Sequence, residues 1–406
     1  MDWNSDYDVD ALLRRLHLLR HSPDSELYMP VLISAIKFDK RIPESERLAI
    51  VRRGVASVLD QPSPNSQILR TAIAQGQEAY FRRPAEEMVL LTSVSLMPRT
   101  KFRERMIEES RLVFSKSVPK AFTSSWIREH SALYEVADHP RSYMKVQVAL
   151  TARSTREAME RGFFDLDFLR GVWNFALGFR KYRLTLIGTG NKPFNSILLG
   201  PQFSVHTKNG VLVEEELGIV GNFHEVNPVS GTAATRAIAA WERKVYRRLA
   251  AIGHRTKLKE AFVRYARALD EKDQDACLLG LWSLIEGLTG TLGARYEVTI
   301  RRAANLFTSP EPNRSVLQHL REHRNGIAHS GRESELGELL VSQAKLFVEE
   351  LLDFHLAQGR HFENFEEACQ FLDFPGDRAR LKRQIDLRRL ALSLRERGER
   401  RGVEGN

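Results

Sequence analysis

The amino-acid sequence predicts an α+β protein that is predominantly helical. Apolar residues recur every three or four positions through most of the chain, which is typical of amphipathic helices. Between about residues 85 and 225 the pattern changes to short alternating segments rich in β-branched residues, which indicates strands. With 406 residues, the chain has the length of two or three domains. We therefore expect a helical N-terminal segment (1–84), a small mixed α/β unit (85–228), a helical bundle (229–358) and a basic helical tail (359–406).

The composition is that of a globular protein with a basic surface. A hydrophobic fraction of 42% is ordinary for such a chain, and a formal net charge of +9 favours an anionic partner, most commonly nucleic acid. The two cysteines, Cys277 and Cys369, are too few for a disulfide framework or a cysteine zinc site. The sequence lacks an apolar run long enough to span a membrane and a signal-peptide pattern, so we expect a cytoplasmic protein without a membrane partner.

Helix and strand patterns divide the first 228 residues. Helical periodicity covers residues 7–59, with prolines as breaks, and residues 67–83. A wide apolar stripe predicts a further helix over 155–179. Strands are expected within 86–98, 110–118, 143–152, 183–188, 195–207 and 211–220.

The remainder of the chain has the pattern of successive helices with short breaks, which is typical of a bundle. These helices are expected within 235–253, 258–270, 273–293, 297–307, 313–329 and 333–357. Residues 377–401 are dense in arginine with interspersed leucines, which predicts a basic amphipathic helix. Such a helix could bind RNA or acidic lipid, whereas a solvated or packing helix with extended arginines is the commoner outcome.

A short motif within 319–332 combines the residue types needed to cut RNA. Arg324 and Asn325 are followed, after three residues, by His329. RNA is cleaved without a metal when its 2′-hydroxyl attacks the adjacent phosphate. Histidine can move the protons because its pKa lies near neutrality, and arginine can stabilise the developing charge. The ordinary alternative is a helix end that carries an exposed arginine and a C-terminal histidine.

The spacing within this motif favours a site shared by two chains. Two residues five positions apart on a helix are separated by roughly 140° of rotation, so Arg324 and His329 of one chain would point apart. A helix break at Gly326 would relax this separation. Convergence of two copies of the motif is the more natural solution, and we expect a homodimer or higher homo-oligomer.

The motif and the helices before it resemble the HEPN ribonucleases, in particular Apea-like HEPN domains. The similarity covers residues 230–358, where helix 278–290 precedes an arginine-containing helix and then the motif. It implies a HEPN-like bundle and a dimeric endoribonuclease that needs no metal or cofactor. Arg324, Asn325 and His329 would be catalytic, with Glu286 lining the site. Relatives of this kind serve as prokaryotic toxins or antiviral effectors, so the N-terminal region is expected to sense a partner, such as a phage component or a regulatory protein, or to restrain the site.

Glu286 also stands out on physical grounds. It is the charged residue in the otherwise apolar stretch 277–292. A carboxylate on such a helix needs a partner to offset the loss of hydration. Arg324 or another basic residue of the later helices is one candidate, and a purely structural ion pair is an equally good interpretation.

Two alternatives to the ribonuclease remain open. The first is a non-catalytic HEPN-type module that binds RNA or protein through its basic surface. The second is a zinc hydrolase, because His319, Glu322 and His323 match the H-x-x-E-H pattern in which two histidines share a helix face. A third zinc ligand would come from Glu396 or Glu399, but these glutamates lie in an arginine-rich tail that would repel a cation.

Overall fold

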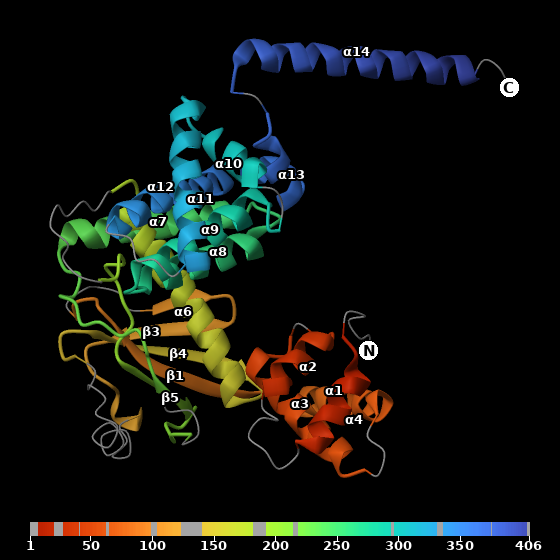
Figure 1. Ribbon diagram of the computed structural model, residues 1–406. Coiled ribbons are helices and arrows are strands. Elements are labelled where there is room, and N and C mark those ends of the chain that lie inside the picture. Colours follow the sequence, from red (N-terminus) through yellow and green to blue (C-terminus); the bar gives the residue numbers. More distant parts are fainter. Residues whose placement is uncertain are drawn as a thin grey trace. The chain divides into compact units, whose positions relative to one another are not determined.

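The computed structural model describes most of the chain. The described residues are 7–19, 27–39, 41–61, 65–98, 104–122, 140–181, 192–213, 218–293, 296–330, 336–374 and 376–403, with backbone alone at 328–330 and 397–403. They form helices and one antiparallel sheet (Figure 1), which confirms the predicted α+β class and its predominance of helix. The chain divides into two compact units, Met1–Leu166 with Leu199–Pro228, and Asp167–Leu198 with Val229–Asn406.

The first unit begins with a small helical core. Its helices are α1 (Val9–Leu18), α2 (Met29–Ala35), α3 (Glu44–Leu59) and α4 (Ser66–Arg82). Their apolar faces meet in one buried cluster that includes Leu13, Leu32, Val51 and Ile73, all at most 1% exposed. The boundaries follow local chemistry, because the Asn65 side chain accepts from the Ile68 amide at 3.0 Å and so begins α4.

The sheet of the first unit has six antiparallel strands in the order β2-β3-β4-β1-β5-β6. β1 pairs with β4 in register, Leu90 opposite Val148, so that alternate apolar residues face one side. A short 3-10 helix (Lys120–Phe122) follows β3. The strands are β1 (Glu86–Val94), β2 (Glu104–Ile107), β3 (Ser110–Ser115), β4 (Met144–Ala152), β5 (Gln202–Thr207) and β6 (Gly218–Ile219).

Three of the predicted strands, at 86–98, 110–118 and 143–152, are present with shorter ends. Of the predicted strand 195–207, Gln202–Thr207 is a strand and an isolated bridge joins Leu199 to Val94. The prediction is wrong at its start, where Asn195 and Ser196 bond to helices instead. Of 211–220, a strand forms at 218–219 and an isolated bridge joins Leu212 to His206. Segment 183–188 lies outside the described residues. β2 was not predicted.

Helix α6 (Thr155–Gly178) contributes its first half to one unit and its second half to the other. Two glycines allow its close packing. A Cβ at Gly162 would lie 2.9 Å from the Leu90 side chain of β1, and a Cβ at Gly171 would collide with the Phe262 carbonyl of α8 (Arg255–Asp270). The apolar stripe predicted from the sequence therefore packs on a strand at one end and on a helix at the other.

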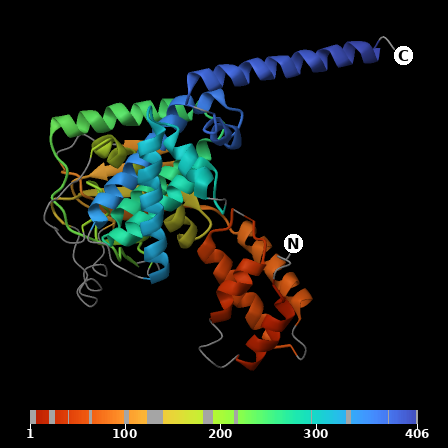
Figure 2. The same ribbon diagram turned by 45° about the horizontal axis from the view of Figure 1, so that its top comes forward.

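The second unit is a bundle of helices, seen from a second side in Figure 2. The most apolar helices, α9 and α12, pack against each other and form its core, with Leu281, Ile285, Val348 and Leu351 fully buried. None of the helices in the described part of the chain combines the length and apolar character needed to cross a bilayer. The helices of the bundle are α7 (Thr232–Leu249), α8 (Arg255–Asp270), α9 (Gln274–Thr289), α10 (Tyr296–Ala304), α11 (Pro310–Ser330), α12 (Gly337–Gln358), the 3-10 turn Gly359–His361 and α13 (Phe365–Phe371). A last helix, α14 (Arg378–Val403), follows them in the chain.

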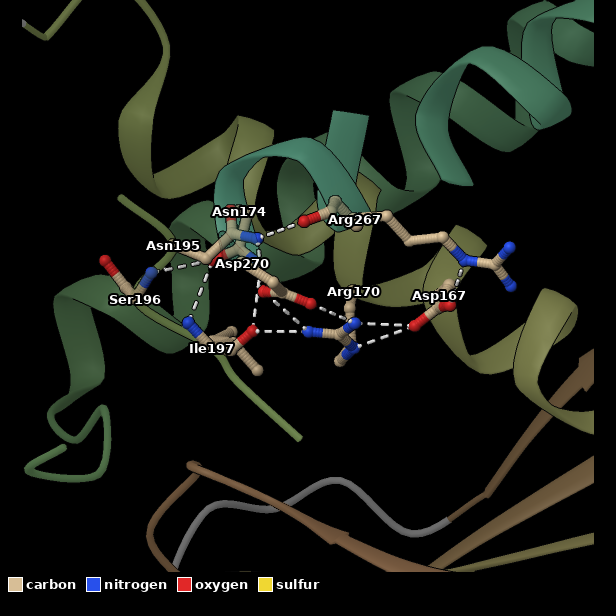
Figure 3. A network of polar contacts seen from close by, with 9 residues as sticks. Asp167, Arg170, Asn174, Asn195, Ser196, Ile197, Arg267 and Asp270 are labelled. Atoms are coloured by element: carbon tan, nitrogen blue, oxygen red, sulfur yellow. Dashed lines mark hydrogen bonds and ion pairs between the residues drawn. The ribbon is translucent and has the colours of Figure 1, made fainter. Parts of the chain in front are cut away.

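A buried polar network ties α6 and α8 together inside this unit (Figure 3). The Arg170 side chain is fully buried and lies between two carboxylates, 2.5 Å from Asp167 and 2.7 Å from Asp270. Burial by itself would lower the pKa of Arg170, but Asp270 and Asp167 raise it above its usual value. Arg170 also donates to the Ile197 carbonyl, so the network fixes the segment that precedes β5.

Candidate active site on helix α11

Arg324 lies in the penultimate turn of α11 and is half-buried. Its Nη1 donates to the Tyr296 hydroxyl at 3.2 Å and to Asn325 Oδ1 at 3.1 Å, and its guanidinium carbon lies 5.8 Å from the centre of the Tyr296 ring. Both acceptors are neutral. Among the described residues no carboxylate forms an ion pair with Arg324, so the partners that the structure describes orient its charge without neutralising it.

Helix α11 continues through the motif. It runs from Pro310 to Ser330, and Gly326 is an exposed helical residue with no atom within 4 Å of the position that a Cβ would occupy. The helix break that would have brought Arg324 and His329 of one chain together is therefore absent. Their backbone positions are separated by roughly 140° around the helix axis. The His329 backbone lies in the last turn, and its side chain lies outside the described part.

Asn325 and Tyr296 are the two residues that fix the Arg324 guanidinium. Asn325 is half-buried, and its described contact is the bond that it accepts from Arg324. Tyr296 is the first residue of α10, where it offers both a hydroxyl acceptor and a ring face to the same cation. Sequence reasoning missed Tyr296. The sequence offers one weak indication of its role, which is its position at the start of the helix that precedes the motif helix.

Glu286 lies on α9, half-buried, and its carboxylate accepts from the Trp282 indole N–H at 2.8 Å, one turn earlier on the same helix. In the described part of the structure no basic side chain forms an ion pair with it. The hydrogen bond from the Trp282 indole therefore offsets part of the hydration that the Glu286 carboxylate loses. We had expected an arginine in this role. The structure does not bring Glu286 and Arg324 within bonding distance of each other.

The histidines of the zinc pattern lie three turns into the same helix. The rings of His319 and His323 meet edge to face with centroids 4.5 Å apart, as residues four positions apart on a helix can. Glu322 between them is exposed. Across the described ranges, no group of three or more His, Cys, Asp or Glu side chains is arranged to hold a metal ion, so a third ligand for this pair is not found there.

Other cations of the second unit differ from Arg324 in their partners. Arg180 binds Glu350 at 2.5 Å, and Arg302 binds Asp373 at 2.6 Å. The charge of each is offset by a carboxylate, whereas the described partners of Arg324 are a phenol and an amide. The described partners of Arg324 thus orient its guanidinium without offsetting its charge, an arrangement in which an arginine can bind an anion.

Comparison of the chain with models of protein families, with curated proteins and with solved structures finds no match. The resemblance to HEPN ribonucleases therefore stays a prediction from the motif Arg324, Asn325 and His329 and from the order of the helices that precede it.

Proposed function

We propose that the chain is a metal-independent endoribonuclease of the HEPN type. The observation that carries the proposal is the position of the Arg324 guanidinium, which Tyr296 and Asn325 hold while no carboxylate among the described residues pairs with it. A phosphodiester carries one negative charge that rises toward the transition state, and a planar guanidinium can bind two of its oxygens at once. The same helix carries His329, the proton-transfer group that such a reaction requires.

In the proposed reaction the ribose 2′-oxygen forms a bond to the adjacent phosphorus while the bond from phosphorus to the 5′-oxygen breaks. The His329 imidazole accepts the 2′-hydroxyl proton, and the imidazolium that forms donates this proton to the leaving 5′-oxygen. Arg324 stabilises the charge on the non-bridging oxygens, and Asn325 and Tyr296 hold the guanidinium in position. The products are a 2′,3′-cyclic phosphate and a 5′-hydroxyl, so no water, metal or cofactor enters the step.

The site is proposed to be composite, made where two copies of the chain meet at α11. The continuous helix argues for this, because Arg324 and His329 of one copy lie on different sides of it. The open surface around Gly326 leaves room for a second helix or for RNA to approach the backbone. Glu286 would line this site from α9, held by Trp282.

A cytoplasmic toxin or antiviral effector is the role that fits such an activity. The first unit would then sense a phage component or a regulatory protein and control the second. Control by the first unit is in principle separable from cleavage, because the motif and the described contacts of the motif all lie within the second unit.

The test is cleavage of RNA by the purified chain in EDTA. We expect cleavage to persist, to disappear in His329→Ala and to leave cyclic phosphate ends. His319→Ala is the matched control, since this exposed histidine lies on the same helix and should be dispensable. Activity that vanishes with EDTA and with His319→Ala would favour the zinc hydrolase. Salt-sensitive RNA binding without products would favour the non-catalytic module.

A further inference from the structure

Helix α14 (Arg378–Val403) is a strongly basic surface element that the proposed reaction does not use. It contains ten lysines and arginines against three acidic residues. None of its described side chains is buried. Between Arg378 and Glu396, the range whose side chains the structure describes, no cation of the helix forms an ion pair. The contact described for them is that of Arg388 with the face of the Phe374 ring, at 5.0 Å from its centre.

The cations surround the helix. At about 100° per residue, the described lysine and arginine side chains occupy every quadrant of the helix circumference. The exposed apolar residues form two rows on opposite sides, one with Ile385 and Leu392 and the other with Leu387, Leu390 and Leu394. These five side chains are 42–60% exposed. An amphipathic helix that lies on a membrane has one apolar face and one polar face, so a bilayer would leave one of these rows in water.

A flexible polyanion fits this distribution better than a flat surface. An RNA strand can pass around a helix and place phosphates against cations on several sides. Arginine, which supplies nine of the ten cations, also stacks on bases through its guanidinium plane. We propose that α14 is an RNA-binding helix that holds RNA through its phosphates, largely independent of sequence, and that it acts apart from the α11 site.

This inference goes beyond the proposed function and does not depend on cleavage. It is tested in full-length His329→Ala protein, in which RNA stays intact whether or not the wild type is a nuclease. The variant replaces Arg380, Lys382, Arg383 and Arg389 by glutamine, which preserves helix propensity and leaves the Arg388 contact unchanged. The matched control replaces the exposed cations Arg14, Lys37, Arg53 and Arg82 of the first unit, and so removes the same charge.

Binding of fluorescein-labelled oligouridine is measured by anisotropy over a range of NaCl concentrations. The α14 variant should weaken binding by about 10-fold or more, and the slope of log Kd against log salt should fall by about 3 if all four cations contact phosphates of a single strand. The control should change Kd by no more than about 3-fold and leave the slope unchanged. Circular dichroism checks that the variant keeps its helix content.

Three results would overturn the proposal. One is an unchanged Kd and slope in the α14 variant. Another is an equal loss in the control, which would mean that net charge alone matters. The third is α14-dependent binding to phosphatidylglycerol vesicles without α14-dependent RNA binding. Failure of wild-type cleavage alone would contradict the proposed function and leave this inference intact.

Discussion

Arg170 and Arg324 lie in the same unit and have opposite surroundings. Arg170 is fully buried, and two carboxylates and a carbonyl receive its hydrogen bonds. Arg324 is half-buried and bonds to a phenol and an amide. The first arrangement neutralises a charge that could not otherwise be buried, whereas the described partners in the second orient a charge without neutralising it. An arginine's partners therefore indicate whether it stabilises the fold or can bind an anion.

The comparison predicts its largest effect on stability. Arg170→Met should lower the free energy of unfolding by about 3–5 kcal/mol, because Asp167 and Asp270 would remain buried without their shared partner. Arg324→Met should cost less than about 1 kcal/mol. Urea denaturation followed by tryptophan fluorescence measures both, since Trp173, Trp241 and Trp282 lie in the second unit. Adding Asp270→Asn to Arg170→Met should recover part of the loss. Equal costs for the two methionine variants would invalidate the comparison.

For RNA cleavage, in contrast to stability, we expect the larger effect from the substitution of Arg324. Arg324→Met should lower kcat for RNA cleavage by about 10²–10³-fold, the usual cost of removing one donor that stabilises a charged transition state. Arg180→Met is a control that removes an exposed arginine already paired with Glu350, and it should leave cleavage unchanged. Wild-type kcat in Arg324→Met, with cleavage otherwise established, would remove the arginine from the proposed site.

His355 is a basic residue of the same unit whose surroundings differ from those of both arginines. It is fully buried, donates to the Leu288 carbonyl at 2.8 Å and has no carboxylate partner among the described residues. Burial lowers its pKa to about 4, so it is neutral in the fold. The unfolded chain takes up a proton below about pH 6.5, so this group should cost up to about 3 kcal/mol of stability as the pH falls toward 4. His355→Gln should flatten the pH dependence of the urea midpoint in that window, and an unchanged dependence would contradict the assignment.

The smallest effect is expected at Tyr296. Tyr296→Phe keeps the ring beside Arg324 and removes one hydrogen bond, so kcat should fall about 5-fold with little change in KM. Tyr143→Phe is the matched control, because that hydroxyl bonds Val226 in the first unit. It should affect stability alone. A larger effect of Tyr143→Phe on kcat would argue against a positioning role for Tyr296.

Much of the fold could be predicted because its signals are local. The helical periodicity of α6, α9 and α12 and the alternation of β1, β3 and β4 are visible in short windows of sequence. β2 is only four residues long and carries charged residues, and Glu104 pairs across the hairpin with Arg111. Its pattern is too short to be distinguished from a loop. The segment that begins at Asn195 has the composition of a strand, but it is held by bonds to Ala266 and Asp270, distant in sequence.

Some residues of the candidate site could likewise be predicted from the sequence, and others could not. Arg324, Asn325 and His329 are predictable because their spacing is a local motif. Tyr296, 28 residues before Arg324, reaches it only through the packing of α10 against α11. The contact between Glu286 and Trp282 was within reach of sequence reasoning, because the two residues are one helical turn apart. It was missed because an ionic partner was expected for the carboxylate.

The composite site is tested most directly by mixing two inactive variants. Arg324→Met and His329→Ala should each lose cleavage, and refolding or subunit exchange should produce dimers that carry one intact arginine and one intact histidine in a shared site. We predict that cleavage in EDTA returns in the mixture and that its level follows the fraction of mixed dimers, measured by two affinity tags. Mixed dimers that form but remain inactive would contradict a shared site.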